Sequence, residues 1–200
     1  MTPALASIDL IPWPKLYSFH GNAGSIPEAI KRLYTNAKDE DLEEIFKTLE
    51  SALHYPDEIC QATPFATPYL LPLLGRPCSN PFKIHLLGLL TKVYKCAMFG
   101  PTEMGLKVGV DQVEDPEQYR GDNATLGDGE FTHAISQDEI FSWEVLVHND
   151  FQQSRETIES LANLEGKTVG KLAVTLLKYV DDYYGEREKE VEAALKELAQ

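Results

Sequence analysis

The sequence predicts an all-α protein in which helices stack in pairs. Apolar residues recur at helical spacing over most of the chain, prolines and glycines stand where helices would begin or end, and no run alternates apolar and polar residues as a half-buried strand does. Any strands are therefore expected only within residues 106–135. At 200 residues the chain is expected to form one domain. Its parts are an N-terminal cap (1–24), helix pairs (25–98), an irregular, acidic, Gly-rich insertion (99–136) and C-terminal helices (137–200).

Each helix is expected where apolar residues recur at intervals of three and four positions. Several of these segments begin at a residue that suits a helix N-cap, such as Ser25, Asp39 or Ser136. Trp13, between two prolines, is expected to cover the open end of the stack. The expected helices cover about residues 27–36, 39–53, 63–75, 80–98, a segment from 136, 151–164, 168–183 and 186–199.

The stretch 49–90 is expected to be the structural centre of the chain. A helix end, a polar elbow and two apolar helical patterns follow one another there. Pro68 and Pro72 are expected to bend the first of these patterns, because proline fixes φ and lacks an N–H. Leu70 and Leu73 fall on its apolar side, so the sequence predicts that they belong to the core.

Two helix pairs precede residue 100 at a spacing typical of HEAT and armadillo repeats, which are about forty residues long. Residues 62–74 read ATPFATPYLLPLL, and Trp13 followed by the turn at 20–23 stands before the first helix. Over about residues 12–98 these features resemble a group of small bacterial HEAT-like repeat proteins. The resemblance implies a short α-solenoid. Some members of the group look like immunity proteins, which neutralise a toxin made by the same or a neighbouring cell.

The chain is acidic, with 18 Lys and Arg against 32 Asp and Glu and a formal charge of −14. Between Glu103 and Glu144 eleven acidic residues face only Lys107 and Arg120, a local balance of −9. Such a charge disfavours nucleic acid and anionic membranes and speeds encounter with a basic protein. The alternatives are that the charge serves solubility alone and that the insertion is a solvated loop.

The residues expected to bind a partner are the carboxylates of the insertion and two aromatic side chains among them. Charge would raise the association rate, and the aromatic rings would supply buried contact area. We therefore expect the protein to be an immunity protein that binds and neutralises a basic toxin. The expected binding residues are Asp111, Glu114, Asp115, Glu117, Tyr119, Asp122, Asp128, Glu130 and Phe131.

No motif predicts an enzyme, a metal site or a cofactor. Cys60, Cys78 and Cys96 lie too far apart for a zinc motif or a disulfide framework, and they predict unpaired thiols in a reducing cytoplasm. The acidic residues at 111–117 and at 122–130 do not follow the pattern of a calcium-binding loop. The N-terminus lacks the features of a secretory signal, and no apolar run approaches a membrane span.

Two other functions stay open. An enzyme, or an accessory factor of one, would have a pocket on the concave face of the helices, where His20, His54, Asp57 and Glu58 are the first candidates. A scaffold of a larger assembly is indistinguishable from a binding protein at this level. The histidines follow no metal-binding spacing, so each is expected to be a hydrogen-bonded structural group. The oligomeric state is not predicted.

Overall fold

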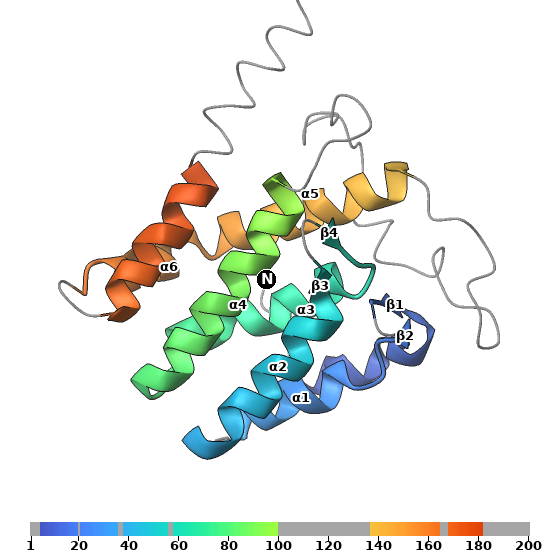
Figure 1. The fold of residues 1–200 in the computed structure, drawn as a ribbon, viewed down its shortest axis with the longest axis horizontal. Coiled ribbons are helices and arrows are strands. Elements are labelled where there is room, and N and C mark those ends of the chain that lie inside the picture. The colour runs from blue at the N-terminus through green and yellow to red at the C-terminus, as the bar shows by residue number, and fades with distance from the viewer. Residues whose placement is uncertain are drawn as a thin grey trace, which may run out of the picture.

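A computed structural model describes residues 5–19, 21–35, 38–55, 58–99, 137–164 and 168–181. This part of the chain is mostly helical, as Figure 1 shows, and the all-α prediction is confirmed. Its α-helices are α1 (Ile26–Tyr34), α2 (Leu42–Leu53), α3 (Thr63–Leu70), α4 (Asn80–Phe99), α5 (Gln137–Gln153), α6 (Arg155–Ala162) and a further helix over residues 168–181. Short 3-10 helices precede or continue them: η1 (Leu5–Leu10), η2 (Trp13–Lys15), η3 (Asp39–Asp41) and η4 (Leu71–Gly75).

Two small hairpins correct the prediction that strands are confined to 106–135. Strands β1 (Tyr17–Ser18) and β2 (Gly21–Asn22) pair antiparallel, and so do β3 (His54–Tyr55) and β4 (Glu58–Ile59). Each strand has two residues, which is too short for an alternating pattern to be visible in the sequence. Both hairpins form where the chain turns between helical segments.

The helices from α1 to α5 pack against one another in several pairs. Helix α1 packs on α2 and on α3, α2 packs on α4, and α5 packs on both α3 and α4. The cross-contacts from α2 to α4 advance together along both helices: Phe46 stacks on His85, Glu50 pairs with Lys92, and His54, just past the end of α2, reaches Cys96. Helices α2 and α4 therefore run side by side in the same direction.

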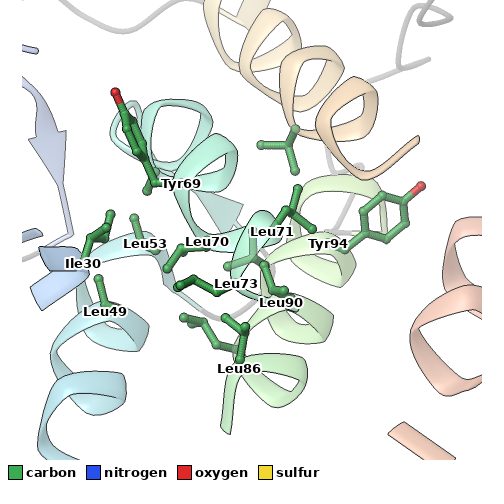
Figure 2. Close-up of a cluster of buried hydrophobic side chains, with 14 of the residues drawn as sticks. Ile30, Leu49, Leu53, Tyr69, Leu70, Leu71, Leu73, Leu86, Leu90 and Tyr94 are labelled. Atoms are coloured by element: carbon green, nitrogen blue, oxygen red, sulfur yellow. The ribbon is translucent and has the colours of Figure 1, made fainter. Parts of the chain in front are cut away.

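The turn formed by α3 and η4 fills the space between α2 and α4. Figure 2 shows Leu70 and Leu73 between Leu49 and Leu53 of α2 and the leucines of α4, and both are 0% exposed. The expected role of these two leucines in the core is confirmed. At roughly 1.5–3 kcal/mol for each fully buried large apolar side chain, this layer contributes much of the stability of the fold.

The prolines of this turn change the type of helix. Pro68 lies inside α3, which ends at Leu70, and Pro72 lies in the first turn of η4. A proline offers no N–H to an α-helical hydrogen bond, so the chain continues as the tighter 3-10 turn.

Two helix starts differ from the expected capping. The Ser25 side chain makes no cap hydrogen bond to α1. The residue at the N-cap position of α2 is Asp41, whereas Asp39 begins η3 and its carboxylate accepts a hydrogen bond from the Ser79 hydroxyl, 2.7 Å away. Asp39 thus joins the starts of two parallel helices. Ser136, the third expected cap, lies outside the described residues.

The C-terminal helices also begin and end at other residues than expected. Residues 151–153 belong to α5, and α6 begins after a break at Ser154. Leu164, expected on an apolar helix face, lies beyond α6 and is 39% exposed. The expected helix over 186–199 lies outside the described residues. No helix in the described ranges is long and apolar enough to cross a membrane.

Candidate functional sites

The nine expected partner-binding residues all fall between positions 111 and 131, outside the described residues. The structure does describe the two helices that border this segment: α4 ends at Phe99, α5 begins at Gln137, and the two helices pack against each other. Figure 1 shows β3 and β4 beside the end of α4 and next to α5. Two groups of titratable side chains lie in this same part of the fold.

The first group is buried between α4 and α5. The Tyr94 hydroxyl and the Nδ1 atom of His148 share a hydrogen bond of 2.8 Å, and both side chains are almost fully buried. Glu144 is also buried and lies one helical turn before His148 on α5. His148 is therefore hydrogen-bonded, as expected from the sequence. Burial between α4 and α5 keeps the Tyr94–His148 pair from bulk solvent.

A side-chain hydrogen bond also joins α3 to α5. The hydroxyl of Thr67, which is fully buried, donates a hydrogen bond to the carboxylate of Asp150 at 2.6 Å. Trp143 is 2% exposed and belongs to the core. Helix α5 thus enters the core with polar as well as apolar side chains.

The other group lies where β3 meets α4. Nδ1 of the half-buried His54 is 3.9 Å from Sγ of the half-buried Cys96. Burial lowers the pKa of His54; the charge of Glu50 opposes this shift and that of Lys92 adds to it. The Nε2 atom of His54 is buried without a hydrogen-bond partner in the described part of the chain. A neutral imidazole thus faces a thiol.

The sequence did not reveal this pair, because no Cys and His stand at a local motif spacing and 42 residues separate the two. The sequence indicates the pair only indirectly, through the positions of the two residues at the ends of helices. His54 follows the last turn of α2 and Cys96 lies on the last turn of α4, so the pair becomes visible only once these helices are known to run in parallel.

The elbow after β4 holds a second cysteine in a very different setting. Cys60 is fully buried, and its thiol donates a hydrogen bond to the Ala52 carbonyl, 3.1 Å away. Burial raises the pKa of this thiol to about 11, despite a hydrogen bond with Thr63 that acts in the opposite direction. Because the thiolate is the reactive form, Cys60 is an inert structural thiol.

The neighbouring Gln61 attaches the N-terminal segment to the elbow. Its Oε1 accepts a hydrogen bond from the Tyr17 amide at 2.9 Å, and the Ala62 amide donates to the Tyr17 carbonyl at 3.2 Å. Gln61 Nε2 is buried and has no partner among the described residues. Polar groups here hold chain segments together, and no arrangement of nucleophile, base and oxyanion donors is formed by these atoms.

Of the four residues expected for an enzyme pocket, the structure describes two, His54 and Glu58, which lie on the paired strands β3 and β4. His54 is half-buried, Glu58 is exposed on β4, and His20 and Asp57 lie outside the described residues. His85 stacks on Phe46 and so serves packing. Within the described ranges, no three His, Cys, Asp or Glu side chains lie close enough together to hold a metal ion.

Comparison of the chain with protein-family models, with curated proteins and with solved structures found no match.

Proposed function

We propose that the protein binds a basic protein partner through its acidic insertion, residues 99–136, and that it acts as an immunity protein that neutralises a basic toxin. The observation that carries the proposal is the uneven distribution of charge. Residues 100–136 contain eight Asp or Glu against Lys107 and Arg120, and so hold −6 of the chain's −14. The described residues contain sixteen acidic and twelve basic side chains, a balance of only −4.

Several charged side chains of the described residues already form ion pairs with one another. Arg32 lies near Asp41 and Glu44, and Arg155 forms ion pairs with Glu159 and Asp181. Carboxylates of the insertion have few basic residues nearby in sequence, so they are the better source of a field that attracts a cationic surface. Such steering raises the association rate and weakens as salt is added.

We further propose that the helices form a short HEAT-like α-solenoid that carries this insertion. The support is the similar sequence separation of the residues that meet along η3, α2 and α4. Asp39 contacts Ser79, 40 residues further on, and the pairs Glu50–Lys92 and His54–Cys96 are each separated by 42 residues. An offset close to the length of one repeat is what stacked helix pairs produce. The contacts of α3 with α1 and with α5 are also those expected if these three helices form the second layer of such a solenoid.

The decisive experiment is protection against a toxin encoded beside the gene, followed by affinity measurements with the purified pair. Reversing four charges with Asp111→Lys, Glu114→Lys, Asp115→Lys and Glu117→Lys is expected to weaken binding by about tenfold or more, equivalent to 1.4 kcal/mol. It should also reduce the dependence of affinity on salt.

The matched control reverses four exposed carboxylates that lie outside the insertion, Glu28, Glu43, Glu58 and Glu156. Both variants change the net charge by the same amount, so only a specific role of the insertion separates them. Equal affinities of the two variants would show that net charge alone matters. A neighbouring toxin that the protein neither binds nor neutralises would refute the proposed function.

A further inference from the structure

The imidazole of His54 lies against the thiol of Cys96 at the end of the parallel contact between α2 and α4. Nδ1 and Sγ share a long hydrogen bond of 3.9 Å. One turn earlier in both helices, Glu50 and Lys92 form an ion pair. A cysteine within proton-transfer reach of a base is the arrangement of an activated nucleophile, and such distances are often longer before a ligand binds.

We propose that Cys96 is a thiol-modification site, with His54 as its general base and a low-molecular-weight disulfide of the glutathione class as its electrophile. The thiol proton passes to Nδ1 of His54, and the sulfur of Cys96 attacks one sulfur of the disulfide. The other sulfur leaves as a thiolate and takes up the proton. One S–S bond breaks and one forms, so the products are a mixed disulfide on Cys96 and one small thiol.

The charges around the pair affect the protonation of His54 and the formation of a thiolate at Cys96. Because burial lowers the pKa of His54, with Glu50 opposing and Lys92 adding to the shift, the imidazole is neutral at pH 7 and has a lone pair available for the thiol proton. Lys92 lies one turn before Cys96 on α4, where its positive charge favours a thiolate. The negative end of the α4 dipole opposes the thiolate, since Cys96 is in the last turn. Because Lys92 and His54 favour the thiolate and the helix dipole opposes it, we expect Cys96 to be moderately activated.

The two other cysteines supply references within the same chain. Cys60 is fully buried, and its thiol has a pKa raised to about 11 by burial. Cys78 is half-buried like Cys96, and it precedes α4, whereas Cys96 lies in the last turn of that helix. Cys78 therefore measures the rate of a partly exposed thiol in this protein, and Cys60 measures the rate of an inaccessible one.

The test exposes the full-length chain to oxidised glutathione at pH 7 and follows each cysteine by peptide mass spectrometry. Cys96 is expected to react at least about tenfold faster than Cys78, which is below the range that a well-placed general base contributes. His54→Gln should remove this advantage, whereas His85→Gln, at a histidine on α4 that stacks on Phe46, should leave it unchanged. The rate at Cys96 should also fall in acid as His54 takes up a proton, and because burial lowers the pKa of His54 this fall should lie below the ordinary histidine value of about 6.5.

The wild-type chain unfolded in urea provides a control that does not depend on any variant remaining folded. There Cys96 and Cys78 should react at similar rates, because the imidazole is no longer beside the thiol. Equal rates in the folded protein, or a rate at Cys96 that is unchanged in folded His54→Gln, would overturn the proposal. The outcome is independent of whether the acidic insertion binds a toxin.

Discussion

At the scale of single residues, burial and the neighbouring groups determine the protonation and hydrogen bonding of each polar side chain. Cys60 donates to a backbone carbonyl and is held protonated, whereas the half-buried Cys96 faces a neutral imidazole. Trp13 is buried too, and its Nε1 donates to the Ile8 carbonyl at 2.7 Å. The chemistry of each of these groups follows from its tertiary neighbours.

The thiol of Cys60 is expected to make stability depend on alkaline pH. Its pKa of about 11 in the folded protein exceeds the ordinary value of 9.0, so the unfolded state loses the proton first. The thiol's contribution is complete below pH 9 and is lost as the pH rises through about 11, a loss of roughly 2–3 kcal/mol. Urea unfolding at a series of pH values measures it.

The matched variants for this measurement are Cys60→Ala and Cys78→Ala. The difference in unfolding free energy between wild type and Cys60→Ala should shrink from pH 8 to pH 11, because the variant lacks the thiol. Cys78→Ala, at a half-buried position, controls for the removal of a thiol as such. If the unfolding free energies of wild type and Cys60→Ala changed with pH in the same way, the Cys60 thiol would not have a raised pKa in the folded protein.

Leu70 and Leu73 are expected to carry a large share of the stability. Both are 0% exposed, so truncation to Ala should cost roughly 2–5 kcal/mol each, as lost burial plus a cavity. Leu10 is 83% exposed, and Leu10→Ala should change stability by less than about 0.5 kcal/mol. Chemical denaturation of the three variants decides the matter. A small loss for Leu70→Ala or Leu73→Ala would show that this stripe is not core.

At the scale of helices and hairpins, side-chain hydrogen bonds join elements that are distant in sequence. Thr67 links α3 to α5, Ser79 links the start of α4 to η3, and the Tyr34 hydroxyl donates to the Tyr69 carbonyl at 2.7 Å. Each bond fixes the position of one element against another. The apolar contacts between them supply most of the energy.

The contribution of the hydrogen bond between Thr67 and Asp150 to stability is measurable with a single conservative substitution. Thr67→Val keeps the shape but removes the donor, and it is expected to cost about 1–3 kcal/mol because a charged acceptor loses a buried partner. Thr91→Val is the control, since the Thr91 hydroxyl donates only to the Leu87 carbonyl within α4. Thermal or urea unfolding should separate the two variants. Equal losses would mean that the link adds nothing beyond local packing.

For the whole molecule the dominant physical property is its charge of −14. Like charges that are spread over a compact chain repel one another, and salt screens this repulsion over about 10 Å at 0.1 M. The free energy of unfolding is therefore expected to rise between 20 mM and 500 mM sodium chloride. Denaturation by urea, which adds no ions, measures this rise.

The fourfold charge reversal in residues 111–117 provides the comparison for this salt dependence. It reduces the net negative charge, so the rise in stability with salt should become smaller. A stability of the wild-type protein that falls with added salt would indicate that attractive ion pairs, such as Arg155–Asp181, outweigh the long-range repulsion.

The sequence by itself determined the helical class and the positions of most described helices. Leu42, Ile45, Phe46 and Leu49 recur at helical spacing, and α4 starts at the Asn80-Pro81 pair as expected. Periodicity and proline are local properties of the chain, so they are readable without knowledge of the fold. The net charge and the concentration of acidic residues between positions 103 and 144 are likewise read directly from the sequence.

Only the tertiary structure decided which of these local features meet. The contact of Asp39 with Ser79 and the pairs Tyr94–His148 and His54–Cys96 join residues whose neighbourhood depends on how the helices turn back on one another. Such pairs leave no local spacing in the sequence, because each partner satisfies only the pattern of its own helix. The proton affinities of His54 and Cys60 were likewise set by burial, which exists only in the folded chain.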